Sequence, residues 1–239
     1  MIDKHLRKLR ARDEISVEEE RVIREAAGIA HEVAARKTII RAGDLLSSST
    51  LLLDGLMCRY KDLRNGERQI TELHVAGDFV DLHSFTLKRL DHNIMTLTPC
   101  RIALVPHERL TRITEEHPHL ARIYWFTTNL DAAIHREWEL SLGRRTALSK
   151  TAHLLCELQV RLGLVGLADD SGYDLRLTQI DLAECLGLTA VHVNRTLRQL
   201  REQGLVAVTK GRVEILDHAG LRKVAEFDPA YLYLERRPM

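Results

Sequence analysis

The sequence predicts an α+β protein with three successive parts, and three observations support this. Short β-like runs broken by turn residues fill residues 37–106, apolar residues at helical spacing follow Pro106, and residues 177–216 read as two capped helices and a hairpin. A chain of 239 residues exceeds the usual single domain. We therefore expect two domains, residues 1–142 and 143–239.

The N-terminal domain is expected to be a small antiparallel β-container. Residues 3–34 read as charged, helix-prone sequence ahead of it. The candidate strands are Thr38–Arg41, Thr50–Leu53, Leu56–Lys61, Gln69–His74, Ile94–Thr98 and Arg101–Val105. Many short strands separated by turn residues such as Asp54-Gly55 and Asn65-Gly66 are typical of an antiparallel barrel or jelly roll. The prediction is a β-roll.

A long helix is expected after Pro106. Apolar residues recur at spacings of three and four from Leu120 to Ser141, and aromatic residues such as Trp125 and Trp138 widen the stripe. Such a stripe could pack against the roll on one side and a partner helix on the other, although an ordinary core helix has the same periodicity. Gly143 predicts a hinge, and residues 146–162 predict a further helix.

Residues 177–187 have the pattern of a capped helix ended by a tight turn. Thr178 stands at an N-cap position, where its side-chain oxygen can accept a free backbone N–H. Ile180, Ala183 and Leu186 fall on one helical face, which we expect to point inward. Gly187 can end the helix, because glycine adopts a positive φ at little cost.

A second capped helix follows from Thr189. Its apolar face is formed by Val193, Leu197 and Leu200. Its opposite face carries His192, Asn194, Arg195, Arg198 and Arg201. Two short helices joined in this way bury a shared apolar face and leave the start of the second helix free to enter a DNA major groove.

A β-hairpin is predicted directly after the second helix. Leu205–Thr209 and Arg212–Leu216 meet at Lys210-Gly211, which forms a wing with Lys210 and Arg212 at its tip. Residues 195–212 hold five basic side chains and one acidic side chain, a local charge of +4. A basic face can simply be solvated, but the caps, turn and wing together favour DNA contact. Since the whole chain carries only +1, DNA affinity must come from this cluster.

Other classes of protein are excluded by composition and missing motifs. Four widely separated cysteines without a C-x-x-C pair argue against a zinc site or a disulfide framework and fit a reducing cytoplasm. The charged N-terminus and the lack of a long apolar run predict no signal peptide and no membrane span. Without a Gly-rich phosphate loop, H-E-x-x-H or G-x-S-x-G, we expect no enzymatic activity.

The order β-roll, long helix, hinge and winged helix-turn-helix resembles the Crp/Fnr family of bacterial transcription regulators over nearly the whole chain. Its markers here include Ala42-Gly43-Asp44, Gly77-Asp78-Phe79 and Leu97-Thr98-Pro99-Cys100-Arg101. The resemblance implies a cyclic-nucleotide-binding-like sensor domain and a homodimer paired through helix 118–142. It also implies two recognition helices on a palindromic promoter site, with RNA polymerase as a further partner.

The resemblance places an effector near Gly77-Asp78-Phe79. Cyclic-nucleotide binders of the family follow this turn with an Arg-Ser or Arg-Thr pair that holds the phosphate, whereas this chain has Leu90 and Asp91 there. Leucine cannot pair with a phosphate and aspartate repels it, which argues against a cyclic nucleotide, although Arg89 could substitute if the loop shifts. The candidate effector residues are Asp81, His83, Arg89, Asp91 and His92.

No resident metal or cofactor is expected. The oxygen-sensing branch of the family carries an N-terminal cysteine cluster for iron and sulfur, and this chain has no cysteine before Cys58. His74, His83, His92 and Cys58 could serve as axial haem ligands, but in a chain with 12 histidines a lone one is more often a surface or hydrogen-bonded side chain.

The recognition helix departs from the best-known members of the family, which place Arg-Glu before the shared arginine. Here Ala190 and Val191 occupy those positions, with Arg195 retained, so we expect a different operator. Val191 could contact a thymine methyl, and Arg195 a guanine edge or a phosphate. The predicted DNA-contacting residues are Thr178, Thr189, Val191, His192, Asn194, Arg195, Arg198, Lys210 and Arg212, of which Thr178, Thr189 and Arg198 are assigned to phosphates.

The predicted function is a sequence-specific transcription regulator, either gated by an effector or constitutive. The alternative is a regulatory β-roll protein that senses a cyclic nucleotide or haem and whose main output is not DNA binding. Specific DNA binding with a steep salt dependence would distinguish the two.

Overall fold

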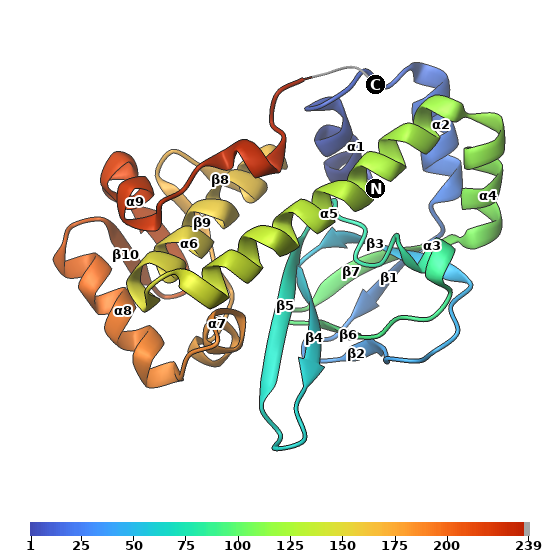
Figure 1. The fold of residues 1–239 in the computed structure, drawn as a ribbon. Coiled ribbons are helices and arrows are strands. Elements are labelled where there is room, and N and C mark those ends of the chain that lie inside the picture. The colour runs from blue at the N-terminus through green and yellow to red at the C-terminus, as the bar shows by residue number, and fades with distance from the viewer. Residues whose placement is uncertain (237–239) are drawn as a thin grey trace.

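A computed structural model describes residues 1–236 (Figure 1). The helices α1 (Asp3–Arg10) and α2 (Val17–Ala26) precede a β-roll, so the expected helical stretch 3–34 is two helices followed by the first strand. A capping box between Ser16 and Glu19 opens α2. The long helix α5 (Pro118–Arg144) crosses the roll and leads to the C-terminal unit, whose tail returns beside α1.

The β-roll consists of two antiparallel sheets, which confirms the predicted fold class. One sheet has the order β1-β7-β3 and the other β2-β6-β4-β5. The strands are β1 (Ala30–Val33), β2 (Thr38–Ile40), β3 (Ser48–Asp54), β4 (Leu56–Asp62), β5 (Arg68–Val75), β6 (Asn93–Thr96) and β7 (Cys100–Pro106). All six predicted strands are present within a few residues of their expected bounds. The additional strand β1 has no fully buried residue, and its sequence AHEV lacks the alternation that marks a half-buried strand.

Helices close the roll and connect it to the C-terminal unit. A short helix α3 (Ser84–Leu87) follows the turn Gly77-Asp78-Phe79, here called the effector turn, and α4 (His107–Glu116) leads into α5. The hinge expected at Gly143 lies two residues later, because α5 continues through Gly143 to Arg144. The next helix, α6 (Ala147–Leu164), begins where Thr146 accepts a hydrogen bond from the Ser149 amide, 3.2 Å away.

The C-terminal unit is a winged helix-turn-helix, as predicted. It contains β8 (Ala168–Asp169), β9 (Gly172–Asp174), α7 (Gln179–Leu186), α8 (Ala190–Glu202), β10 (Val206–Thr209), β11 (Arg212–Ile215), α9 (His218–Ala225) and the 3₁₀ helix η1 (Pro229–Leu232). Its sheet has the order β10-β11-β9-β8, and the strands β8 and β9 were not expected from the sequence. Lys210 (φ 50°) and Gly211 (φ 81°) form the two-residue wing turn, whose positive φ angles match a type I′ hairpin.

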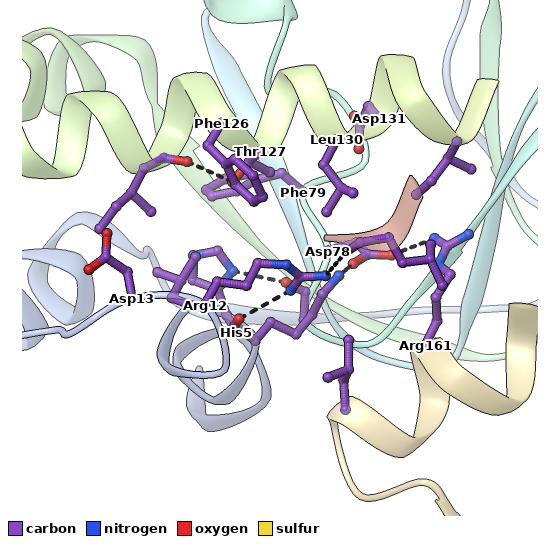
Figure 2. A pocket seen from close by; sticks show the side chains of 17 residues that line it. His5, Arg12, Asp13, Asp78, Phe79, Phe126, Thr127, Leu130, Asp131 and Arg161 are labelled. Atoms are coloured by element: carbon purple, nitrogen blue, oxygen red, sulfur yellow. Dashed lines mark hydrogen bonds and ion pairs between the residues drawn. The ribbon is translucent and has the colours of Figure 1, made fainter. Parts of the chain in front are cut away.

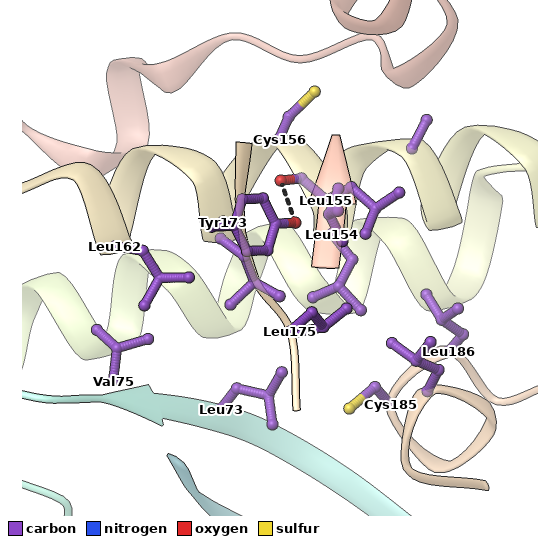
Figure 3. Close-up of a cluster of buried hydrophobic side chains, with 14 of the residues drawn as sticks. Leu73, Val75, Leu154, Leu155, Cys156, Leu162, Tyr173, Leu175, Cys185 and Leu186 are labelled. Atoms are coloured by element: carbon purple, nitrogen blue, oxygen red, sulfur yellow. Dashed lines mark hydrogen bonds between the residues drawn. The ribbon is translucent and has the colours of Figure 1, made fainter. Parts of the chain in front are cut away.

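The β-roll and the C-terminal unit share one apolar core. Leu73 and Val75 of β5 belong to the same buried cluster as residues of α6, β9 and α7 (Figure 3). Tyr173 lies inside this cluster, and its hydroxyl donates to the Leu155 carbonyl at 2.9 Å. Because apolar surface is buried across the junction, the two parts pack as one body rather than as units on a flexible linker. Within residues 1–236, no helix is long and apolar enough to cross a bilayer.

Replacing Leu73 with alanine should destabilise both parts of the protein together. Leu73 is 0% exposed, and removing a buried leucine side chain costs about 2–5 kcal/mol. We expect one urea-unfolding transition, shifted to lower denaturant, by fluorescence and by circular dichroism. The control is Leu63→Ala, since Leu63 is 59% exposed. Two separate transitions, with only the β-roll affected, would contradict a shared core.

Candidate DNA-reading surface and effector region

The first helix of the helix-turn-helix is held by a capping box. The Thr178 hydroxyl accepts from the Asp181 amide at 3.2 Å, and the Asp181 carboxylate accepts from the Thr178 amide at 2.6 Å. Gly187 ends the helix in the left-handed conformation at φ 57°. The expectation for Ile180 is wrong, because its side chain is 64% exposed. Ala183 and Leu186 are buried as expected, and the buried face extends to Leu182, which lies about 200° around the helix from Ile180.

The recognition helix α8 presents a polar face to solvent. Thr189 caps it by accepting from the His192 amide at 3.2 Å. Its packed face consists of Val193, Thr196 and Leu200, with Leu197 partly buried. Its open face carries Asn194, Arg195, Arg198 and Arg201, and Val191 at its start is 81% exposed. These side chains are free to approach base edges and phosphates.

Two contacts orient cationic side chains on this face. Arg195 donates to Nε2 of His192 at 2.7 Å, one turn earlier on the helix. Arg198 forms an exposed ion pair with Glu202 at 2.8 Å. Exposed pairs of this kind contribute little to stability, so Arg198 can exchange Glu202 for a phosphate at little cost.

The structure separates the two basic residues predicted at the wing tip. Lys210 occupies the tip and is exposed. Arg212 lies on β11 and donates to Ser171 at 2.9 Å and to Asp174 at 3.4 Å, so its side chain turns toward the β8–β9 hairpin.

A groove of about 250 Å³ runs between α8 and the wing. The predicted residues Asn194 and Arg198 line it together with Arg201 and Gln179, which were not among the predicted contacts. The signal for Arg201 was its place on the same face of α8. No sequence signal marked Gln179, which joins the groove because the N-terminus of α7 lies beside the wing in the folded protein.

The five candidate effector residues do not form one cluster. The rings of His83 and His92 lie in contact with centroids 5.3 Å apart and planes tilted by 42°, and Asp91 bonds His92 at 2.9 Å and Lys61 at 2.6 Å. Arg89 turns away to the Gly43 carbonyl, 2.5 Å from it. Asp81 is fully buried, where it accepts hydrogen bonds from Thr50 and Ser84. Burial raises the pKa of Asp81 to about 7 and lowers that of His83 to about 3.

The effector turn Gly77-Asp78-Phe79 is covered by other parts of the chain (Figure 2). His5 of α1 bonds the Gly77 carbonyl at 2.9 Å, and a Cβ on Gly77 would lie 2.9 Å from the Lys4 carbonyl oxygen. The Asp78 carboxylate pairs with Lys8 and, at 3.0 Å, with Arg161 of α6. The cavity left between the turn, α1, α5 and α6 measures about 40 Å³, room for a few waters.

The phosphate-binding position of the family holds a buried apolar side chain. Leu90 is buried and packs with Ile40 and Val80 inside the roll. Within residues 1–236, no group of three or more His, Cys, Asp or Glu side chains is arranged to hold a metal ion. All four cysteines are free and buried. Burial raises the pKa of Cys156 to about 12, which disfavours the thiolate that metals bind.

The long helix α5 has two distinct faces. The stripe predicted from the sequence, including Leu120, Ile123, Leu130 and Ile134, is buried against the protein's own core. A second stripe faces solvent at spacings of four and three residues. It contains Trp125, which the sequence pattern assigned to the first stripe but which is 70% exposed, followed by Asn129, Ala132 and Arg136.

Asp81→Asn should remove a pH dependence of stability. The folded protein holds the Asp81 proton up to about pH 7, whereas the unfolded chain releases it near 3.8. Between these values the folded state binds more protons, so the contribution of Asp81 to the free energy of unfolding falls as pH rises. We expect urea unfolding from about pH 4.5 to about pH 7.5 to show the free energy of unfolding of the variant rising relative to that of wild type as the pH increases. The exposed Asp170→Asn is the control, and parallel pH profiles for Asp81→Asn and wild type would contradict the assignment.

Comparison with known proteins matches both halves of the chain. A Crp-like helix-turn-helix domain matches residues 149–224, and a cyclic nucleotide-binding domain matches residues 30–117. The nitrogen fixation regulation protein FixK of Bradyrhizobium diazoefficiens is 30% identical over 194 residues, covering 79% of this chain and 78% of FixK. The transcriptional activator protein FnrL of Cereibacter sphaeroides is 32% identical over 201 residues, covering 81% of this chain and 79% of FnrL.

A solved structure supports the same fold. FixK2 from Bradyrhizobium japonicum superimposes with a TM-score of 0.76 at 24% sequence identity, covering 83% of this chain and 96% of FixK2. The relatives are transcription regulators, which does not favour the alternative of a β-roll sensor without DNA-binding output. The chain belongs to the Crp/Fnr family of DNA-binding transcription regulators.

Proposed function

We propose that the protein binds a palindromic promoter site as a homodimer, with α8 of each protomer in the major groove. The observation that carries this proposal is the open face of α8, a row of polar and cationic side chains above a buried apolar face and beside a basic wing. Val191 and Arg195 are assigned to base edges, with His192 holding Arg195 at 2.7 Å. Thr178, Thr189, Arg198 and Lys210 are assigned to phosphates, together with Arg201.

The solvent-facing stripe of α5 is the proposed dimer seam. Spacings of four and three between Trp125, Asn129, Ala132 and Arg136 give the repeat of a left-handed coiled coil. The small side chain of Ala132 allows two helices to approach closely, and Trp125 supplies a large apolar surface. The buried stripe predicted from the sequence is already used by the protein's own core and is not available to a partner.

We infer that the regulatory input is not a cyclic nucleotide. The carboxylate of Asp78 is engaged by Lys8 and Arg161, and Leu90 offers no charge to a phosphate. The cavity of about 40 Å³ is far smaller than the roughly 300 Å³ or more of small-molecule sites. From membership of the family we further propose a regulator that has no haem, iron–sulfur cluster or enzymatic activity and that acts in the cytoplasm with RNA polymerase.

Arg195→Ala should lose sequence discrimination at one base pair. Truncating a side chain that reads a base edge costs roughly 1–3 kcal/mol of discrimination. A preferred duplex is first selected from a random library with the wild-type protein, and single-base variants are then titrated by fluorescence anisotropy. Lys210→Ala is the contrasting variant, expected to weaken all duplexes alike and to reduce the salt slope by about 1. Unchanged discrimination by Arg195→Ala would remove it from the reading surface.

Ala132→Glu should separate the dimer. Two glutamates facing each other at the centre of the seam repel and lose their hydration on pairing. Sedimentation velocity is expected to show a dimer for wild type and a monomer for the variant, with unchanged circular dichroism. Thr114→Glu, at an exposed position of α4, is the control and should remain dimeric. A dimeric Ala132→Glu would place the seam elsewhere.

A further inference from the structure

Arg36 of the β-roll has an unusual backbone conformation. It lies in the turn between β1 and β2 with φ 61°, in the left-handed region that non-glycine residues rarely adopt. Its amide donates to the Thr96 carbonyl at 2.8 Å, and the next amide, of Lys37, donates to the Thr96 hydroxyl at 3.0 Å. Such a conformation costs about 1–3 kcal/mol and persists only where surrounding contacts hold it.

The Arg36 side chain reaches the helix-turn-helix. Its guanidinium forms a two-pronged ion pair with Asp181 of α7, with Nη2 2.7 Å from Oδ2 and Nη1 bonded to Oδ1. The Asp181 side chain is 1% exposed and also completes the capping box with Thr178. Burial alone would raise the pKa of Asp181, but the hydrogen bonds from Arg36 and Thr178 lower it, so the carboxylate stays charged.

A second contact from the roll holds the other end of the same helix. The Gln69 side chain of β5 donates to the carbonyl of Glu184 at 2.7 Å and to that of Cys185 at 3.3 Å, where α7 leaves carbonyls without helical partners. Between the two contacts, Ile70 of the roll and Leu182 of α7 belong to the same apolar cluster. The β-roll therefore contacts α7 at its start through Arg36, in its middle through the apolar cluster, and at its end through Gln69.

These contacts with α7 also fix the position of the recognition helix, because α7 and α8 share a buried face. That face is formed by Leu182, Leu186, Val193 and Leu200. We propose that Arg36, together with Gln69, is a positioning residue for DNA reading, which fixes the separation of the two recognition helices in the dimer. This inference rests on the proposed palindromic DNA binding. It predicts that the chain reads half-sites at one spacing and rejects others because α8 cannot pivot on the roll.

The test compares affinity for one half-site with tolerance of half-site spacing. Full-length wild type and Arg36→Ala are titrated by anisotropy against a single selected half-site and against palindromes whose spacing is native or altered by one or two base pairs. We expect wild type to lose about tenfold or more in affinity at altered spacings. Arg36→Ala should show half-site affinity within about twofold of wild type, with its loss at altered spacings reduced to about threefold or less.

Matched variants separate positioning from general damage. Asp181→Asn retains a capping oxygen but loses the charged pair, so it should tolerate altered spacing as Arg36→Ala does. Arg36→Lys keeps the charge without the two-pronged geometry and should restore part of the spacing preference. Arg41→Ala removes an exposed arginine from the same roll and should behave as wild type.

Four results would overturn the proposal. An unchanged spacing preference in both Arg36→Ala and Asp181→Asn would show that the contact does not position α8. Tighter binding of the native palindrome by Arg36→Ala would show that the contact between Arg36 and Asp181 holds the recognition helix α8 away from DNA. If wild type binds no half-site, both the proposed DNA binding and the positioning role of Arg36 and Gln69 are wrong. If wild type binds half-sites without a spacing preference, only the positioning role is wrong.

Discussion

The buried guanidinium of Arg161 is the interaction on which the arrangement of the molecule depends. It is almost fully buried, and it donates to Glu157 of its own helix at 2.9 Å, to Asp78 of the effector turn at 3.0 Å and to the Leu73 carbonyl at 2.7 Å. Trp138 of α5 and Tyr231 of the tail also donate to Glu157. A buried charge is tolerated only when its partners are all in place, so this network admits one packing of roll, long helix, α6 and tail.

This constraint changes how the effector turn is understood. The carboxylate of this turn is bound by cations of the same chain, from α1 and α6, and does not face an open ligand site. The turn therefore contacts the C-terminal unit directly, because Asp78 of the turn pairs with Arg161 of α6. Arg36 and Gln69 form a second set of contacts between the roll and the C-terminal unit, at α7.

Local features were predictable because local chemistry sets them. The N-caps at Thr178 and Thr189, the positive φ at Gly187 and the wing turn at Lys210-Gly211 depend on residues within a few positions of each other. The strands of the roll were predictable for the same reason, since turn glycines bound them. The strand β1 was missed because it pairs with β7, about 70 residues later, and its own sequence carries no alternation.

The sequence by itself determined the fold class, the order of its parts, and that α8 presents a polar face to solvent, because capping, turn conformation and helical periodicity act over short distances. Only the tertiary structure decided which stripe of α5 is left for a partner, that Ile180 is exposed, and that Arg212 turns from the wing tip to Ser171. It also decided that Arg36 meets Asp181, 145 positions away. Such contacts depend on how elements pack in space, and neither periodicity nor spacing along the chain records that.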